Sequence, residues 1–232
     1  MIQLSIIIPV LNESLTITAY LQKLKVITQT LTVEIIVVDG GSHDDTIRLS
    51  IPYANKVIQS PKGRAVQMNA GADQASGNVL FFLHADTQLP DGAFSWINNS
   101  VRPEYNWGFY RVKLSGNSFI FRIIETMMNV RSQLTRVATG DQCLFVKKSL
   151  FQKNNGFAKL ALLEDVEICK RLRSQYKPNV IDVAVITSSR RWEEKGIVNT
   201  IVLMWYLRGA YFLGVSPNFL VKQYYRKNTE SS

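Results

Sequence analysis

Short apolar runs alternate with amphipathic stretches between residues 5 and 87 of the chain. Apolar runs that are too short for a helix and rich in β-branched residues are typical of strands buried on both faces. They predict four strands, at residues 5–10, 33–38, 56–59 and 79–87. The stretches between them predict helices, from Asn12 or Ser14 to about residue 31, from His43 onward, and over residues 65–75. This alternation predicts an α/β fold, with a mostly parallel, mixed central sheet and helices on both faces.

The second half of the chain has a less regular pattern. It predicts strands at residues 107–114, 143–146 and 179–186, and helices at residues 91–101, 118–134 and 163–175. The second of these helices carries an apolar stripe that we interpret as core: Ile120, Ile123, Ile124, Met127 and Met128. No linker or internal repeat interrupts the chain, so we predict a single domain over residues 1–232.

The segment from residue 196 to residue 215 is strongly apolar. A membrane span needs about twenty residues with few or no charges, and Asn199, Thr200 and Arg208 interrupt this run. Because Arg208 would be costly in hydrocarbon, we expect a helix that lies on a surface. Aromatic and basic residues between 196 and 227 suit peripheral contact with a membrane: Trp205, Tyr206, Tyr211, Phe212, Lys222, Arg226 and Lys227. A helix docked on the protein core explains the same pattern.

The chain has a formal net charge of +9 and an isoelectric point of about 9.6. Such an excess suits nucleic acid, an anionic membrane surface, or substrates that carry phosphate. No basic block with interleaved aromatic residues occurs, so nucleic acid is the least favoured partner. Cys143 and Cys169 lie in apolar segments and are predicted to be buried, reduced thiols. The N-terminus has no basic region and no small-residue cleavage site, and we expect a cytoplasmic protein.

His84 and Asp86 follow the apolar run of the fourth predicted strand. In open parallel sheets, binding sites collect at the carboxyl ends of the strands. Mg²⁺ and Mn²⁺ bind through one or two carboxylates together with substrate phosphates, so Asp86 is a candidate ligand for such a cation. His84 is either a second ligand or a structural hydrogen-bond donor.

Polar residues also follow the second and third predicted strands. Asp39 precedes two glycines, and it can accept hydrogen bonds from a ribose or a base, or only cap the turn. Lys62, Arg64 and Asn69 come after the third strand. The two cations there can clamp a diphosphate, or they can form a solvated basic loop.

Charged residues in the second half form two more candidate groups. Glu164 and Asp165 open a predicted helix, whose dipole favours ionised carboxylates. One of them can act as general base for an incoming hydroxyl, although acids in a first turn are most often a helix-terminal charge pair. Arg190, Arg191 and Trp192 can hold a phosphate or form a surface patch around a packed tryptophan.

Five of these segments, read in order, resemble glycosyltransferase family 2, whose members are inverting enzymes with the A-type nucleotide-sugar fold. They are residues 5–13 (SIIIPVLNE), 38–46 (VDGGSHDDT), 83–87 (LHADT), 139–142 (TGDQ) and 163–165 (LED). Residues 62–72 (KGRAVQMNAGA) and 188–192 (SSRRW) resemble a small bacterial group within that family, the "transferase 2, radical-SAM/selenodomain-associated" proteins. The resemblance covers residues 2–195, and the order of the motifs is more specific than any one of them.

The resemblance implies a role for each matching residue. Asp86, the last position of the family's Asp-x-Asp motif, would bind the metal–diphosphate with His84 beside it. Asp165, paired with Glu164, would be the general base for in-line attack with inversion. The nucleotide-sugar site would comprise Pro9, Glu13, Asp39, Lys62, Arg64, Asn69, Arg191 and Trp192, and the acceptor site Asp141 and Gln142.

The resemblance therefore implies an inverting glycosyltransferase that needs Mg²⁺ or Mn²⁺. It would move a sugar from a nucleotide-diphosphate sugar to a hydroxyl acceptor, either a small molecule or a lipid. The apolar and basic tail and the expected cytoplasmic location predict that it acts at the inner face of the cell membrane. Residues 1–88 would form a nucleotide-binding half, residues 89–195 an acceptor and catalytic half, and residues 196–232 an apolar and basic tail. Two positions depart from the family pattern: His84 replaces the first aspartate of Asp-x-Asp, and Ser188 replaces a glutamine of polymerising members.

Two other functions fit parts of the same pattern. A nucleotidyltransferase of similar fold would make the activated sugar, but such enzymes carry a Gly-rich basic loop after the first strand, where this chain has residues 9–13 (PVLNE). A catalytically weak scaffold at the membrane would keep the nucleotide-sugar fold without turnover. Detection of sugar-nucleotide hydrolysis would exclude the scaffold. Release of pyrophosphate from a nucleoside triphosphate and a sugar phosphate would indicate the nucleotidyltransferase.

Overall fold

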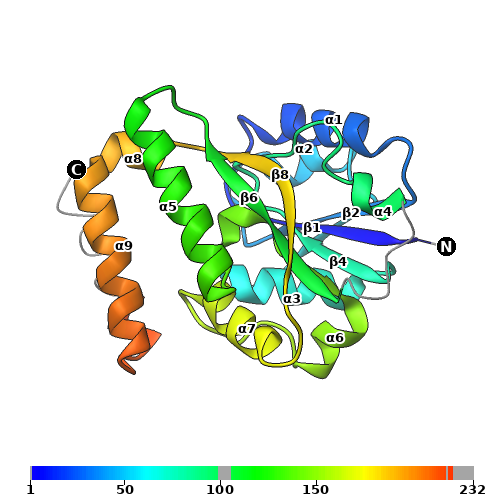
Figure 1. Cartoon of the computed structure of the whole chain (residues 1–232). Coiled ribbons are helices and arrows are strands. Elements are labelled where there is room, and N and C mark those ends of the chain that lie inside the picture. Colours follow the sequence, from blue (N-terminus) through cyan, green and yellow to red (C-terminus); the bar gives the residue numbers. More distant parts are fainter. Residues whose placement is uncertain (1, 99–105, 218, 222–232) are drawn as a thin grey trace.

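The computed structural model describes residues 2–98, 106–217 and 219–221 (Figure 1). The first part of the chain forms β1 (Leu4–Val10), α1 (Ile17–Thr28), β2 (Val33–Asp39), α2 (Thr46–Ser50), β3 (Lys56–Gln59), α3 (Arg64–Gln74), β4 (Val79–Phe82), β5 (Thr87–Gln88) and α4 (Ser95–Asn98). The second part forms β6 (Trp107–Leu114), α5 (Phe119–Thr135), the 3-10 helix η1 (Gly140–Gln142), β7 (Phe145–Lys147), α6 (Lys148–Lys153), α7 (Glu164–Arg173), β8 (Asn179–Thr187), α8 (Arg190–Lys195) and α9 (Ile197–Phe212).

One mixed sheet runs through the molecule in the strand order β3-β2-β1-β4-β7-β6-β8-β5. The first four of these strands are parallel to one another. The short strand β7 runs antiparallel to both β4 and β6, while β6 and β8 are parallel. This topology confirms the predicted mixed α/β sheet, and it brings the carboxyl ends of β1, β2 and β4 to one edge.

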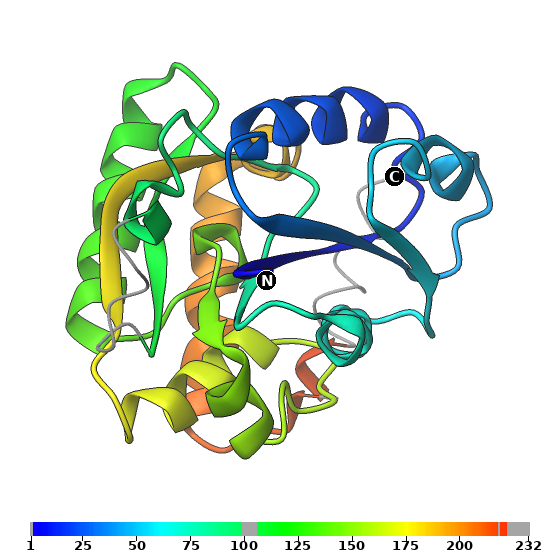
Figure 2. The same cartoon turned by 90° about the vertical axis from the view of Figure 1, so that its right-hand side faces the viewer.

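Two apolar cores cover the two faces of the sheet. Because successive strand residues point to opposite faces, Ile6 and Ile8 of β1 pack beneath α1, while Ile7 packs against α3. The same alternation divides Phe81 and Phe82 of β4 between the two cores. Figure 2 shows β1 and β2 between α1 on one side and α3 on the other. Strands buried on both faces explain why their sequences read as continuous apolar runs.

Helix α3 lies unusually close to the sheet. A Cβ atom at Gly71 would come within 2.5 Å of the Ile7 Cγ2 atom, so only glycine permits this approach. Near the start of the helix, Gln67 Nε2 donates hydrogen bonds of 2.9 Å to the carbonyl oxygens of Val10 and Val38. This amide therefore ties the ends of β1 and β2 to the helix that follows β3.

Two local predictions in this half differ from the structure. Helix α1 begins at Ile17, and neither Asn12 nor Ser14 caps it. Both residues instead link the loop after β1 to the loop after β2. Asn12 Oδ1 accepts the backbone N–H of His43 at 2.9 Å, and the backbone N–H of Ser14 donates to Asp44. The strand predicted to reach residue 87 ends at residue 82, and the chain then turns through the next residues before β5 begins.

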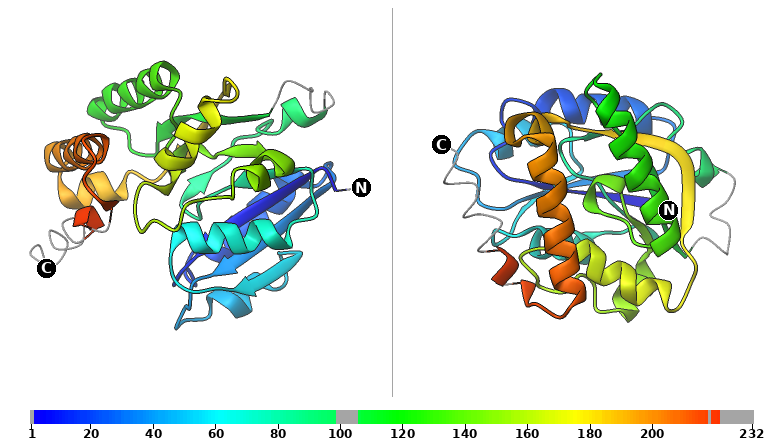
Figure 3. Two further views of the ribbon diagram at one scale, coloured as in Figure 1. Left: turned by 90° about the horizontal axis from the view of Figure 1, so that it is seen from below. Right: turned by 60° about the vertical axis from the view of Figure 1, so that its left-hand side comes forward.

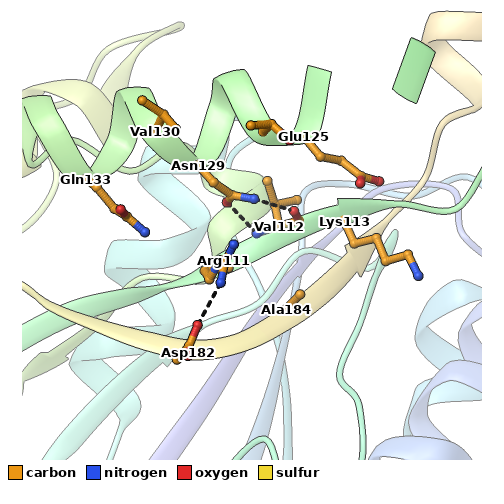
Figure 4. A pocket seen from close by; sticks show the side chains of 10 residues that line it. Arg111, Val112, Lys113, Glu125, Asn129, Val130, Gln133, Asp182 and Ala184 are labelled. Atoms are coloured by element: carbon orange, nitrogen blue, oxygen red, sulfur yellow. Dashed lines mark hydrogen bonds and ion pairs between the residues drawn. The ribbon is translucent and has the colours of Figure 1, made fainter. Parts of the chain in front are cut away.

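Helix α5 buries part of its predicted apolar stripe, because Ile120, Ile124 and Met128 belong to one apolar cluster. Phe121 and Ile124 are buried, but Ile123 and Met127 are 43% and 46% exposed, so the assignment of the last two to the core is wrong. Polar side chains decide the orientation of the helix. Asn129 exchanges two hydrogen bonds of 2.9 Å with the backbone of Val112 in β6, as Figure 4 shows.

Figure 4 also shows the space that this packing leaves between α5, β6 and β8. It is a cavity of about 330 Å³, and the ion pair between Arg111 and Asp182, 2.8 Å long, lies at its floor. None of its lining residues takes part in the candidate site described below. We regard this cavity as a consequence of the helix packing.

The apolar tail forms α9, which docks on the protein by one face. Leu207 and Leu220 are buried against Leu162 and Leu163, and the Lys170 ammonium lies 4.3 Å from the centre of a tyrosine ring on α9. The opposite face leaves Trp205 63% exposed and carries other exposed apolar residues. Within the described part of the chain, none of the helices combines the length and the apolar character that a membrane span requires.

Both views in Figure 3 place α9 beside α5 as an outer layer at one end of the sheet. The basic residues predicted to follow this helix, Lys222, Arg226 and Lys227, lie outside the described residues. The predicted helix over residues 91–101 is shorter, α4, and its last predicted residues also lie outside the described ranges. Both cysteines are buried and unpaired, as predicted.

Candidate functional site

Three cavities meet at Asp86, whose exposed side chain lines all of them. The β1 cavity, of about 290 Å³, lies between the loops after β1, β3 and β4. The α9 cavity, of about 150 Å³, lies between the loop after β4, the start of α7, and α9. The α1 cavity, of about 530 Å³, extends along α1. Asp86 is thus the common point of a connected cleft at the carboxyl edge of the sheet.

The loop that carries Asp86 is held by Tyr20 of α1. The Tyr20 hydroxyl lies 2.9 Å from the carbonyl oxygen of His84 and 3.0 Å from that of Thr87. Burial raises the pKa of this phenol, so the phenol stays protonated and can donate. At the same time Thr87 pairs with Thr187 of β8, which fixes the far side of the loop.

His84 lies buried beneath the 3-10 helix η1. A Cβ atom at Gly140 would overlap the Cε1 atom of His84, so the glycine of the residue 139–142 motif makes room for this ring. Burial and the charge of Arg64 lower the pKa of His84 to about 4, against an opposing effect of Asp86. The imidazole is therefore neutral at neutral pH.

Glu164 and Asp165 line the α9 cavity together with Asp86. The preceding residue, Leu163, has a φ of 65°, which places a non-glycine residue in the left-handed region directly before the pair. The backbone N–H of Gly140 donates to Asp165 Oδ2 at 2.7 Å, and the N–H of Val166 donates to Oδ1 at 2.7 Å. These bonds aim the Asp165 carboxyl group at the loop that covers His84.

Burial perturbs both carboxyl groups of this pair. Burial and the neighbouring Asp165 charge raise the pKa of Glu164 to about 7. Burial also raises the pKa of Asp165, while the two backbone N–H donors and the charges of Arg64 and Arg131 oppose the rise. The pair therefore holds a proton-accepting group whose pKa lies near neutral pH.

The basic residues of the β3–α3 loop lie where the cavities join. Lys62 and Arg64 line the β1 cavity together with Pro9 and Glu13, and Arg64 also lines the α9 cavity. Positive charge thus follows the cleft from the β1 loop toward the acidic pair. This placement brings together most of the residues that the sequence motifs select.

Asp39 and Asn69 have structural partners outside the cleft. Asp39 is completely buried, and its carboxylate caps the turn after β2 by accepting the N–H groups of Gly41 at 2.8 Å and Ser42 at 2.9 Å. Asn69 exchanges hydrogen bonds of 2.8 Å and 2.9 Å with the backbone of Phe157. Both side chains support the walls of the site and are not among the residues that line the three cavities.

Of the two residues predicted for the acceptor site, one lines the cleft and the other has a structural partner. Asp141 lines the α9 cavity. Gln142 is buried, and its Oε1 atom accepts a 2.7 Å hydrogen bond from Ser132 of α5. Trp192 of α8 also lines the α9 cavity, whereas the side chain of Arg191 lies outside the described residues.

Two arginines near the acidic pair were not selected as site residues from the sequence. Arg131 of α5 lies close enough to Asp165 for its charge to lower the pKa of that carboxyl group. Arg208 of α9 lines the α9 cavity, although from the sequence it marks only an interruption of the apolar tail. No local motif marks either residue, because each reaches the cleft through the packing of its helix.

The family model for glycosyl transferase family 2 matches residues 5–150 of the chain. The uncharacterized glycosyltransferase YkcC of Bacillus subtilis (strain 168) is 36% identical over 98 residues, which cover 38% of this chain and 30% of that protein. An undecaprenyl-phosphate 4-deoxy-4-formamido-L-arabinose transferase of Pseudomonas syringae pv. syringae (strain B728a) is 31% identical over 96 residues, which cover 37% and 28% of the two chains. The matches therefore span less than a third of these relatives.

Solved structures share the fold at lower sequence identity. The mannosyltransferase PcManGT of Pyrobaculum calidifontis, solved with GDP-Man and Mn²⁺, has a TM-score of 0.65 and 17% identity over 96% of this chain and 69% of its own. S. aureus TarS 1-349, solved with UDP-GlcNAc, has a TM-score of 0.63 and 20% identity over 81% of this chain and 58% of its own. These likenesses confirm the predicted A-type nucleotide-sugar fold. By the family model that covers most of its length, the chain belongs to glycosyl transferase family 2.

Proposed function

We propose that the chain transfers a sugar from a nucleotide-diphosphate sugar to a hydroxyl acceptor, with inversion at the anomeric carbon. The observation that carries this proposal is the shared cavity that Asp86 and the Glu164–Asp165 pair line together. The β1 cavity beside it has a lining that suits a nucleotide diphosphate, because it includes the cations Lys62 and Arg64. The complexes of PcManGT with GDP-Man and of TarS with UDP-GlcNAc support a nucleotide sugar as donor.

A divalent cation fits this cleft if the donor completes its coordination. Within the described residues, no group of three or more histidine, cysteine, aspartate or glutamate side chains could hold a metal ion by itself. Mg²⁺ and Mn²⁺, however, bind through as little as one carboxylate when substrate phosphates supply other ligands, and Asp86 offers an exposed carboxylate. When bound, the cation would neutralise charge on the leaving diphosphate. The neutral His84 ring is available as a neighbour or ligand.

The residues of the acidic pair would manage the proton of the acceptor. The acceptor oxygen attacks the anomeric carbon while the bond from that carbon to the diphosphate oxygen breaks. The hydroxyl proton passes to Asp165, which two backbone N–H groups hold in place. The neighbouring Glu164 has a pKa that burial and the Asp165 charge raise to about 7. One base on one side of the sugar suits a single displacement, which inverts the configuration.

The test measures hydrolysis of nucleotide-diphosphate sugars and their effect on the melting temperature, with and without Mn²⁺. We expect a nucleotide sugar to raise the melting temperature of the wild type, more strongly with Mn²⁺. Asp86→Asn should lose turnover and the Mn²⁺ effect, whereas Asp165→Asn should lose turnover and keep binding. Asp73→Asn, at an exposed position of α3, is the control. Full turnover by Asp86→Asn would exclude the proposed site. Release of pyrophosphate from a nucleoside triphosphate and a sugar phosphate, in a separate assay, would favour a nucleotidyltransferase.

We further propose that the protein is cytoplasmic, acts at the inner face of the cell membrane, and takes a lipid or small-molecule acceptor. The exposed apolar residues of two adjacent helices support the membrane contact, with Trp205 63% and Phe212 79% exposed on α9, and Phe119 77% and Leu134 79% exposed on α5. The P. syringae relative is named for a lipid-phosphate substrate. We also propose membership of the radical-SAM/selenodomain-associated group, whose 62–72 motif supplies Arg64 of the cleft.

The membrane contact is tested by sedimentation with anionic vesicles. The double variant Trp205→Ser/Phe212→Ser should bind the vesicles at least tenfold more weakly than the wild type, because it removes two exposed aromatic side chains. Ile51→Ser, which removes a 60% exposed apolar residue from the other side of the fold, should bind as the wild type does. Equal binding by all three proteins would show that α9 does not contact lipid.

A further inference from the structure

Helix α9 supplies one wall of the cavity that contains the acidic pair. Met204, Leu207 and Arg208 all line this cavity, and their spacing of three and four residues places them on one face of the helix. Leu207 is buried, so this face is the docked face of α9. The tail helix therefore completes the α9 cavity, and Arg208 is half-buried at its edge.

The wall around Arg208 combines apolar side chains with one positive charge. Leu162 and Leu163 continue the apolar surface from the loop before α7. Among the residues that the structure describes, none forms a hydrogen bond or an ion pair with the Arg208 guanidinium. A half-buried charge is unfavourable without a partner. The planar guanidinium matches a phosphate with two parallel hydrogen bonds, so an anionic ligand would supply that partner.

The distribution of the two cavity arginines indicates which substrate carries this anion. Arg64 lines the β1 cavity and the α9 cavity, so it stands where the diphosphate of a donor would lie beside Asp86. Arg208 lines the α9 cavity and is absent from the lining of the β1 cavity. Arg208 shares the α9 cavity with Glu164 and Asp165, the pair that would take the proton of the acceptor.

We propose that Arg208 binds a phosphate group of the acceptor and that the apolar wall binds an adjoining hydrocarbon part. The acceptor would then be an anionic amphiphile that also carries the hydroxyl to be glycosylated. This inference rests on the proposed function, because it assigns the acceptor side by reference to the donor. Arg208 also has an electrostatic role, because Asp86, Asp141 and the acidic pair line the same cavity and would repel an anion that lacked a cationic partner.

The test uses octyl phosphate below its micelle concentration as the probe, with octyl glucoside as the neutral counterpart and inorganic phosphate as the counterpart without a chain. Affinities are measured by calorimetry on the full chain. Arg208→Gln should weaken octyl phosphate binding about tenfold to a hundredfold, the range for loss of a charge-assisted hydrogen bond. The octyl phosphate affinity of Arg208→Lys should lie between those of the wild type and Arg208→Gln, because lysine keeps the charge but loses the bidentate geometry. Arg48→Gln, at an exposed arginine of α2, is the charge control.

The proposal predicts that octyl phosphate binds more tightly than either counterpart, and that its affinity, unlike that of the neutral octyl glucoside, depends on arginine at position 208. Unchanged octyl phosphate affinity in Arg208→Gln would overturn it. An equal loss of affinity for UDP and GDP in the presence of Mn²⁺ would overturn it too, because Arg208 would then hold the donor. If inorganic phosphate bound as tightly as octyl phosphate, the hydrocarbon chain would contribute nothing and an amphiphilic acceptor would be excluded. If the arginine-dependent binding is found but no nucleotide sugar is hydrolysed, the anion site stands and the proposed function fails.

Discussion

Replacement of Glu164 by glutamine tests the electrostatics of the acidic pair through protein stability. Glu164 is 7% exposed, and burial together with Asp165 raises its pKa from 4.5 to about 7. Between these two pH values the folded protein binds more protons than the unfolded chain, so the free energy of unfolding falls as the pH rises. Ionisation of Glu164 therefore destabilises the folded state at and above neutral pH.

The size of this effect follows from the two pKa values. At about 1.36 kcal/mol for each pH unit between them, the ionised Glu164 destabilises the fold by about 3 kcal/mol at high pH, and by about 1 kcal/mol at pH 5. Glu164→Gln removes this titration. The free energy of unfolding of the variant minus that of the wild type should therefore increase by about 2–3 kcal/mol between pH 5 and pH 8.

Urea unfolding of both proteins at half-unit steps of pH measures this difference. The comparison with the wild type is essential, because His84 acts in the opposite direction. Its pKa is lowered from 6.5 to about 4, so the unfolded chain binds more protons between these values and stability rises with pH. This contribution is common to both proteins and cancels in their difference. A difference that stays constant within about 0.5 kcal/mol from pH 5 to pH 8 would refute the assignment of a raised pKa to Glu164.

Three further substitutions test the packing at the site and elsewhere in the fold. Gly140→Ala should displace the His84 ring, whose Cε1 atom the new Cβ would overlap, and lower the melting temperature by several degrees in a thermal scan. Gly209→Ala, with no atom within 4 Å of the new Cβ in α9, should instead stabilise the protein by about 0.5–1 kcal/mol in urea unfolding. Glu34→Ala removes a buried carboxylate that accepts the Ser5 hydroxyl at 2.6 Å, and should cost about 2–3 kcal/mol by the same measurement.

Local patterns in the sequence were sufficient to predict the strands of the first half. A strand that is buried on both faces needs apolar residues at every position, and that requirement is visible in residues 5–10 and 33–38 without knowledge of their neighbours. The boundaries of β3 and β6 match the predicted ranges, 56–59 and 107–114. Because polar residues that end parallel strands lie at a common edge, the meeting of Asp86 with Lys62 and Arg64 could also be expected.

The orientation of side chains and helices required the tertiary structure. Asp39 follows a strand as Asp86 does, yet its carboxylate accepts the backbone N–H groups of the turn after β2. From the sequence, both this capping role and a role in ligand binding were open. The buried face of α5 is decided by Asn129, which hydrogen-bonds the backbone of β6. These hydrogen bonds join Asn129 to Val112 of β6, which is 17 residues away in the chain. The apolar spacing within the helix could not reveal them.

The sequence by itself thus determined the fold class, the family and the edge of the sheet where the chemistry is expected, because these depend on residue types over short stretches. Only the tertiary structure decided that α9 closes the cavity and that Arg208 lines it together with the acidic pair. These residues lie far apart along the chain and carry no common motif. Their proximity results from apolar docking of α9 on Leu162 and Leu163, a contact that folding creates.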